Sequence, residues 1–272
     1  MFDATYVINL DRSPERWAAM QRVLVQTGLR NVIRLPGVDG QRLEIAALQA
    51  EGVLSQELAG FDPACRTAEI GCGVSHAGVL GDILARGFRH ALVLEDDVVP
   101  TGAPADWPAR ARAAFADLPA DWDLWYLFRC LDVRPRVQRV TPRTVIPWAP
   151  QSAAAYAVSA AGARTLLAAI TPLTCAVDRA YMEVVKARRL ACFAASPMLF
   201  DPGLGSQPSV LRAAAPSHAF IENGINRPPE YWPARYLAHL GEAPTVASTF
   251  AEWWYRGTTM MRRFWSRGER GA

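Results

Sequence analysis

Several features that would assign a protein to a class at once are missing from this chain of 272 residues. No stretch contains the roughly 18 consecutive apolar residues of a membrane-spanning helix, so we expect no such helix. No basic segment precedes the first apolar run, "TYVINL", and this pattern argues against a signal peptide. With 51% hydrophobic and 20% charged residues, the chain can instead fill the core of one large domain.

Lysine and cysteine are both scarce. Lys186 stands alone against 28 arginines, and the net charge is only +3. Residues 250–272 contain five arginines and two glutamates, so they account for the whole excess and the rest of the chain is neutral. A neutral body argues against binding of nucleic acids. The five cysteines form no CxxC pair and no Cys/His ligand spacing, which favours a reduced, cytoplasmic protein.

Short apolar runs alternate with helical stretches along the chain. A first helix is bounded by Ser13 as N-cap, Pro14 at the first helical position and Gly28 as the stop. The continuous apolar runs are typical of central parallel strands. The order predicts an α/β fold: a single Rossmann-type domain over residues 1–240, with a mainly parallel central sheet flanked by helices. Further strands are expected at 5–10, 31–35, 91–94, 122–128, 152–158 and 191–196, and further helices at 43–58, 72–86, 105–117, 160–170 and 178–188.

The stretch "HALVLEDDVVP" carries three neighbouring carboxylates at the end of an apolar strand, Glu95, Asp96 and Asp97. Ligands of open α/β sheets bind beyond the carboxyl ends of the strands. Carboxylates this close repel one another unless a cation compensates, and hard divalent cations prefer oxygen ligands. In extended geometry Glu95 and Asp97 would share a side and Asp96 would face the other. The alternative is that the acids cap the next segment or face solvent.

Two further motifs follow the same logic. In "EIGCGVSHAGVL", Gly71 and Gly73 allow close backbone approach, and Ser75 and His76 are expected in or near a first helical turn, which suits phosphate or ribose oxygens. The alternative is a structural histidine near a helix start. In "INLDRSPER", the residues after the first strand could meet a nucleotide, or they could form a solvated cap: Asp11, Arg12 and Arg16.

The order of "YVINLDRSPERW", "EIGCGVSHAGVL" and "ALVLEDDVVP" resembles glycosyltransferase family 25, which includes bacterial lipopolysaccharide and lipooligosaccharide galactosyltransferases and collagen galactosyltransferases. The resemblance continues through "SAAAYAVSAAGARTLL" and "CAVDRAYME" and covers about residues 5–210. It implies a GT-A fold, a nucleotide-sugar donor, usually a UDP-hexose, and inverting transfer to a hydroxyl of a bacterial surface glycan. The sequence alone names neither the sugar nor the acceptor.

The resemblance also implies roles for individual residues. Glu95 and Asp97 would hold Mn²⁺ or Mg²⁺ on the donor diphosphate, and Asp96 would support the sugar or ribose. Inversion needs a base for the acceptor hydroxyl, and Asp178 in "CAVDRAYME" is the candidate; alternatively it caps the helix that starts at Arg179. The remaining donor-binding residues implied by the resemblance are Asn9, Asp11, Arg12, Arg16, Ser75 and His76.

The C-terminal segment 245–272 is predicted to form a basic amphipathic helix. In "FAEWWYRGTTMMRRFW" the apolar residues recur at helical spacing, and such a Trp-rich basic helix suits an anionic membrane surface through residues 250–267. Its alternative is a helix docked on the body. For the whole chain, two other functions compete with a transferase: an inactive sugar-nucleotide-binding protein of the same fold, and a phosphohydrolase of the haloacid dehalogenase type.

Overall fold

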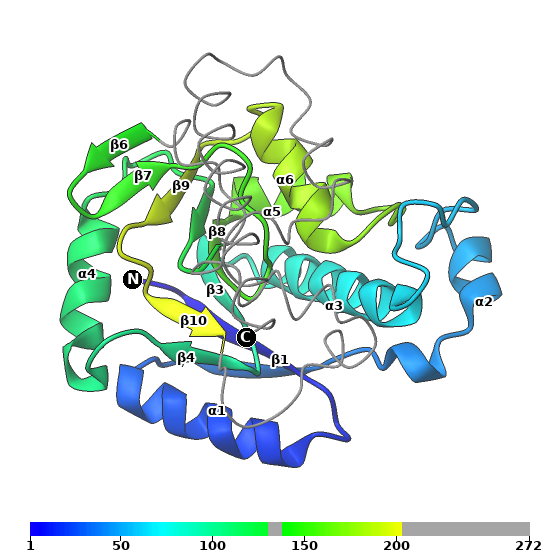
Figure 1. Ribbon diagram of the computed structural model, residues 1–272, viewed down its shortest axis with the longest axis horizontal. Helices are drawn as coiled ribbons and strands as arrows, with labels where there is room; N and C mark the ends of the chain where they lie inside the picture. The colour runs from blue at the N-terminus through cyan, green and yellow to red at the C-terminus, as the bar shows by residue number, and fades with distance from the viewer. Residues whose placement is uncertain (130–137, 203–272) are drawn as a thin grey trace, which may run out of the picture.

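The computed structural model describes residues 1–129 and 138–202 (Figure 1). Its strands are β1 Ala4–Asn9, β2 Val32–Pro36, β3 His90–Glu95, β4 Val98–Pro100, β5 Leu124–Tyr126, β6 Gln138–Thr141, β7 Thr144–Ile146, β8 Ala155–Ser159, β9 Cys192–Ala195 and β10 Phe200–Pro202. Its α-helices are α1 Pro14–Thr27, α2 Ile45–Ala50, α3 Arg66–Ala85, α4 Trp107–Ala116, α5 Ala160–Ala169 and α6 Val177–Lys186. Two 3₁₀ turns, Gly40–Arg42 and Pro104–Asp106, complete the described elements.

The central sheet has eight strands among the described residues, in the order β2-β1-β3-β8-β5-β9-β7-β6. Strand β1 pairs in parallel with β2 and β3, and β5 pairs in parallel with β9. Strand β8 lies antiparallel between β3 and β5, so β1, β2, β3, β5 and β9 all run in one direction. The predicted α/β fold with a mainly parallel central sheet is therefore confirmed.

Helices cover both faces of this sheet, and two apolar clusters form the core (Figure 1). The alternation of β3 shows the division: Ala91 and Val93 pack in the cluster that includes α3, α5 and α6. Leu92 and Leu94 pack in the cluster that includes α1 and α4. All four side chains are fully buried, as the unbroken apolar run predicts.

The helix boundaries follow the local sequence signals only in part. Pro14 begins α1 and Gly28 ends it in the left-handed conformation, with φ of 64°, which glycine adopts without strain. Ser13 occupies the N-cap position, as predicted, but its side chain makes no capping hydrogen bond. Of the helical stretch expected at 43–58, only α2 is an α-helix.

The largest boundary error concerns α3. The helix was expected to begin at residue 72, but it begins at Arg66, which places Gly71 and Gly73 inside it. Gly71 is required there for packing, because a Cβ at this position would lie 2.6 Å from the carbonyl oxygen of Val38. The close backbone approach predicted for these glycines therefore serves contacts within the protein.

Other differences arise from backbone features that composition does not reveal. Strand β8 begins at Ala155 rather than at residue 152, because Ser152 has a positive φ of 102° and leaves the extended conformation. The hairpin of β6 and β7 and the small sheet of β4 and β10 were not predicted. No described helix is long and apolar enough to span a membrane. The domain boundary at residue 240 and the helix predicted at 245–272 lie outside the described residues.

Candidate functional site

A polar cluster lies at the end of β3 on the face covered by α1. Arg16 of α1 forms ion pairs through Nη2 with the carboxylates of Asp96 and Asp97, the latter at 3.0 Å. Asn9, the last residue of β1, donates a hydrogen bond from Nδ2 to Oδ2 of Asp96 at 2.5 Å. Because β1 and β3 are adjacent and parallel, their carboxyl ends bring these side chains together.

The cluster is nearly closed to solvent. The side chains of Arg16, Asp96 and Asp97 are 13%, 7% and 15% exposed. Burial raises the pKa of Asp96 above its ordinary value, although Arg16 and the Asn9 hydrogen bond oppose that shift. The Nε of Arg16 is buried and has no hydrogen-bond partner among the described residues. The guanidinium thus keeps a donor for an anion while it neutralises two acids.

The remaining residues predicted after β1 lie around this cluster rather than in it. Arg34 of β2 donates to Oδ1 of Asn9 at 2.9 Å and to Asp11 at 2.7 Å. Arg12 forms an ion pair with Asp39 at 2.8 Å. Asn9 and Arg16 therefore contact the acidic turn directly. Asp11 is connected to Asn9 only through Arg34, and Arg12 points to Asp39 instead.

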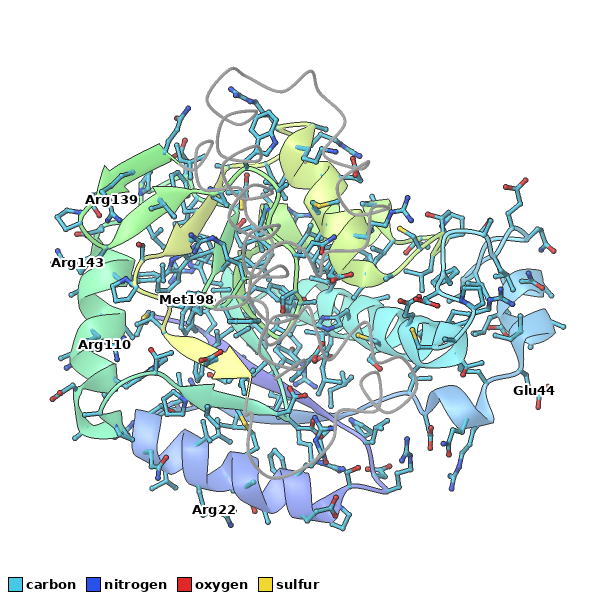
Figure 2. All side chains as sticks on the ribbon, in the orientation of Figure 1. Arg22, Glu44, Arg110, Arg139, Arg143 and Met198 are labelled. Carbon is cyan, nitrogen blue, oxygen red and sulfur yellow. The ribbon has the colours of Figure 1, made fainter. Side chains whose placement is uncertain are left out.

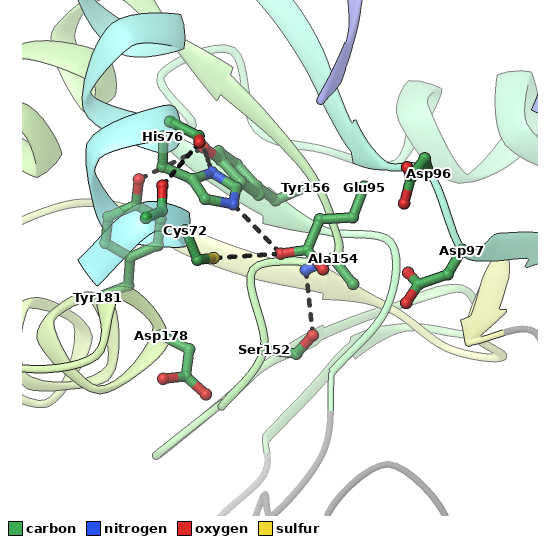
Figure 3. A network of polar contacts seen from close by, with 12 residues as sticks. Cys72, His76, Glu95, Asp96, Asp97, Ser152, Ala154, Tyr156, Asp178 and Tyr181 are labelled. Atoms are coloured by element: carbon green, nitrogen blue, oxygen red, sulfur yellow. Dashed lines mark hydrogen bonds and ion pairs between the residues drawn. The ribbon is translucent and has the colours of Figure 1, made fainter. Parts of the chain in front are cut away.

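A second cluster lies on the opposite face of the sheet, against α3 (Figure 3). Oε1 of Glu95 lies 3.3 Å from Nε2 of His76 and 3.7 Å from Sγ of Cys72. Nδ1 of His76 lies 3.0 Å from the hydroxyl of Tyr156, which is 3.4 Å from that of Tyr181. His76 is fully buried, so its ring is held by these contacts.

The glutamate and the cysteine of this cluster differ in protonation. Burial opposes ionisation of Glu95, but the hydrogen bond with His76, together with Arg16 and Cys72, outweighs it and lowers the pKa of this carboxyl. Burial, together with the negative charges of Glu95 and Asp178, raises the pKa of the Cys72 thiol well above its usual value. A carboxylate therefore accepts hydrogen bonds from its neighbours beside a neutral thiol.

Ser75 and His76 do not lie at a helix start, as was predicted, because α3 begins nine residues before Ser75. Ser75 donates from Oγ to the carbonyl of Gly71 at 2.7 Å and accepts from the amide of Val38 at 2.8 Å. These contacts fix the segment after β2 against α3. In this structure Ser75 holds the backbone, whereas His76 faces Glu95.

Asp178 is the second residue of α6, in the positively polarised first turn. The capping alternative is wrong, because α6 begins at Val177 with Ala176 as its N-cap; Oδ1 of Asp178 accepts a hydrogen bond from the amide of the next residue, Arg179, at 2.7 Å. Its charge also acts on Cys72, so Asp178 lies on the α3 side of the sheet (Figure 3).

The three acids do not alternate as an extended strand would arrange them. Glu95 ends β3 and faces α3, whereas Asp96 and Asp97 lie in the following turn and both reach Arg16. In donor type the turn fits a hard divalent cation, because Asp97 offers carboxylate oxygens. The contacts of Glu95 with His76 and Cys72 both use Oε1.

Sequence reasoning missed Cys72, Tyr156 and Tyr181. It found no Cys/His ligand spacing, but Cys72 and His76 are four residues apart on one helix, a spacing that places them on the same face. The helix expected at 72–86 already included both residues, so their spacing of four was the signal that could have revealed this pair. The two tyrosines carry no local signal, since β8 and α6 meet His76 only through the tertiary fold.

Comparison with known proteins identifies the relatives of this chain. Residues 2–101 match the model described as Glycosyltransferase family 25 (LPS biosynthesis protein). Inactive glycosyltransferase 25 family member 3 of Homo sapiens is 32% identical over 225 residues, which cover 74% of this chain and 37% of that protein. Procollagen galactosyltransferase 1 of Danio rerio is 29% identical over 231 residues, 74% of this chain and 36% of that protein.

The mainly parallel sheet, with polar side chains at the carboxyl ends of β1 and β3, is that of a GT-A-like α/β protein. The chain is a member of glycosyltransferase family 25, as the order of its three motifs predicted. It spans well under half the length of the two relatives described above. One of those relatives is named as inactive and the other as a galactosyltransferase, so family membership leaves the activity to be argued from the site.

Proposed function

We propose that this protein transfers a hexose, galactose or glucose, from a nucleotide sugar, UDP-linked, to a hydroxyl of a bacterial surface glycan such as lipopolysaccharide, with inversion at the anomeric carbon. The observation that carries the proposal is the cluster of Asn9, Arg16, Asp96 and Asp97 at the carboxyl ends of β1 and β3. It combines a guanidinium for phosphate oxygens with carboxylates for a cation and a ribose.

Each residue has a chemical task in this proposal. Arg16 binds the diphosphate, with its buried Nε as a donor, and Asn9 with Asp96 orients the nucleoside or sugar. Asp11, Arg12 and Arg34 lie around the same cluster and would complete the donor site. Asp97 and Glu95 would hold Mn²⁺ or Mg²⁺, which supplies Lewis-acid stabilisation of the leaving diphosphate when bound.

The bond changes of an inverting transfer assign the remaining role. The acceptor oxygen attacks the anomeric carbon from the face opposite the nucleotide, and the bond from that carbon to the phosphate oxygen breaks. The electron pair leaves on the diphosphate, while Asp178 takes the proton of the acceptor hydroxyl. Asp178 lies in the first turn of α6, where the positive end of the helix dipole suits a carboxylate.

A panel of UDP- and GDP-sugars tests the proposal by calorimetry, with and without Mn²⁺. We expect one UDP-hexose to bind in a Mn²⁺-dependent manner. Asp97→Asn should weaken that binding about tenfold or more, the equivalent of one charge-assisted contact. Asp121→Asn, at an exposed position outside the cluster, is the matched control. If no nucleotide sugar binds, the proposal fails.

An inactive sugar-nucleotide-binding protein is the second candidate, because a relative that is 32% identical carries the name inactive. The same panel separates the two functions. Binding that leads to neither hydrolysis of the donor nor transfer to glycan acceptors would favour the inactive protein. Slow release of free hexose would favour the transferase.

We also propose a cytoplasmic protein that attaches to the inner face of the membrane through residues 250–267, where a lipid-linked acceptor would be found. The support is the basic, Trp-rich composition of that segment. Flotation with anionic liposomes tests it, using the full chain and a chain without residues 245–272. Equal recovery of both in the top fraction would exclude the membrane contact.

A further inference from the structure

We propose that Cys72, His76 and Glu95 form a zinc site on the α3 face of the sheet, separate from the Mn²⁺ or Mg²⁺ position at Asp97. Their Sγ, imidazole nitrogen and carboxylate oxygen all lie within 4.8 Å of one another. The residues come from two rigid elements, since Cys72 and His76 belong to α3 and Glu95 ends β3.

The spacing of the ligand atoms fits a tetrahedral ion. Bonds of about 2.0–2.2 Å to nitrogen and oxygen and about 2.3 Å to sulfur place neighbouring ligands of tetrahedral zinc roughly 3.3–3.6 Å apart. Here the Nε2–Oε1 distance is 3.3 Å and the Sγ–Oε1 distance is 3.7 Å. Two of the three ligand pairs therefore already have nearly the separation of a tetrahedral zinc shell, and the third lies within 4.8 Å.

The hydroxyl of Tyr156 supports the tautomer of His76 that has its proton on Nδ1 and can bind a metal through Nε2. A ligating histidine usually donates its other ring N–H to a polar partner, which fixes the tautomer. Nδ1 of His76 has such a partner in the hydroxyl of Tyr156 at 3.0 Å, and Tyr156 can in turn donate to Tyr181. Nε2 is thereby left for the metal.

The protons balance in the binding step. Without metal, the N–H at Nε2 of His76 and the thiol of Cys72 both donate to Oε1 of Glu95. On binding, the Cys72 proton passes to solvent and the His76 proton moves to Nδ1, where Tyr156 accepts it. One proton is released for each ion bound, so the affinity should rise with pH.

The ligand types select zinc over the cation proposed for the donor. A thiolate and an imidazole suit zinc, whereas Mg²⁺ and Mn²⁺ prefer oxygen ligands. Three protein ligands leave one tetrahedral position for water or a substrate atom. The site can be reached from the side of Glu95, whose side chain is 29% exposed, while His76 is 0% exposed.

This inference is independent of the proposed transferase activity, because zinc can bind whether or not the protein transfers sugar. Glu95 is common to both proposals. Asp97 belongs only to the donor site and Cys72 only to the zinc site, so the variants Asp97→Asn and Cys72→Ser distinguish failure of one proposal from failure of the other.

The test is titration of the metal-free full chain with Co²⁺, a spectroscopic substitute for zinc. We expect one equivalent to produce a thiolate-to-cobalt charge-transfer band and the intense visible bands of a tetrahedral ion, and one equivalent of Zn²⁺ to remove them. Cys72→Ser should abolish the charge-transfer band. Cys65→Ser, seven residues earlier on the same helical segment and about 10 Å away along its axis, should retain it.

Two measurements cover the case in which Cys72→Ser fails to fold. X-ray absorption of the zinc-loaded wild-type chain should show one sulfur ligand, with the other ligands nitrogen or oxygen. Tyr156→Phe, which keeps the ring and removes the hydroxyl, should lower zinc affinity about 10- to 100-fold. Absence of the cobalt band in the wild type, its persistence in folded Cys72→Ser, or a zinc shell with no sulfur or several would overturn the proposal.

Discussion

On one face of the central sheet, at the end of β3, Arg16 holds Asp96 and Asp97 in ion pairs. On the other face, the thiol of Cys72 and the imidazole of His76, both on α3, contact the carboxylate of Glu95. The acids of the two clusters, Glu95 on one face and Asp96 with Asp97 on the other, are consecutive in the chain, yet they have different partners. A short acidic motif can therefore serve two sites when a strand ends inside it, because each face of the sheet supplies different neighbours.

Successive side chains of β3 point to opposite faces of the sheet, and this alternation explains why Glu95 and Asp96 belong to different clusters. Ala91 and Val93 face α3, and Glu95 continues that series. Leu92 and Leu94 face α1, and Asp96 continues the other series. Asp97 would return to the α3 side in a longer strand, but the turn keeps it beside Arg16.

The largest expected effect tests whether the α3 side supplies the base. Asp178→Asn should lower the rate of transfer about 10²- to 10⁴-fold, the usual contribution of a general base, while donor affinity stays close to that of the wild type. Parallel measurement of transfer rate and calorimetric donor binding checks both statements. Wild-type transfer by the variant would remove Asp178 as the base.

The next effect tests the charge balance on the α1 side. Arg16→Ala leaves two mostly buried carboxylates without their counter-charge, and we expect the free energy of unfolding to fall by about 3 kcal/mol. Urea denaturation measures the change. Arg22→Ala, at an exposed site of the same helix that points away from the body (Figure 2), should stay within about 0.5 kcal/mol. Equal stability of the two variants would mean that Arg16 does not hold the turn.

A smaller effect compares the pH dependence of the two faces in the presence of a chelator. The pKa of Glu95 is lowered below its ordinary 4.5, so its contribution to stability is present above that value and is lost as the pH falls through the folded-state pKa. The pKa of Asp96 is raised above its ordinary 3.8, so its contribution is present below that value and is lost as the pH rises.

Urea titrations across the acid range read out this contrast. The stability of the wild type relative to Glu95→Gln should increase with pH, and its stability relative to Asp96→Asn should decrease. Slopes of the same sign for both variants would contradict the assignment of opposite environments to the two acids.

The smallest effect concerns the packing of α3, which carries Cys72 and His76. Gly78→Ala meets nothing within 4 Å and should stabilise the protein by up to about 1 kcal/mol through helix propensity. Gly71→Ala brings the same gain in helix propensity, but the new Cβ would clash with the carbonyl oxygen of Val38. We therefore expect the free energy of unfolding to fall by about 1 kcal/mol. Thermal denaturation compares them, and stabilisation by both changes would show that the start of α3 is loosely packed.

The sequence predicted the parts of the structure that depend on local pattern. The buried run Ala91–Leu94 identified β3, and Pro14 and Gly28 fixed the ends of α1. The resemblance gave Asn9 and Arg16 as donor-binding residues, and the structure places both beside the acidic turn because the parallel strands β1 and β3 end at one edge. The family was also predicted correctly, because three motifs in a fixed order are far more specific than any one of them.

What the sequence did not reveal depends on contacts between distant segments. Ser75 was predicted to bind a ligand at a helix start. Because α3 begins at Arg66, Ser75 lies inside the helix and connects Gly71 to Val38 by hydrogen bonds. The pairing of His76 with Glu95 and Tyr156 joins three elements that no local rule connects. The positive φ of Ser152 and the hairpin of β6 and β7 likewise reflect tertiary constraints.

One measurement tests the division of the acidic turn most directly: anomalous diffraction from a crystal of the full chain soaked with a UDP-hexose, Mn²⁺ and Zn²⁺. Difference maps at the two absorption edges should place manganese beside Asp97, against the donor diphosphate. They should place zinc among Cys72, His76 and Glu95. A single position shared by both metals, or manganese at the cysteine and zinc at Asp97, would contradict the account.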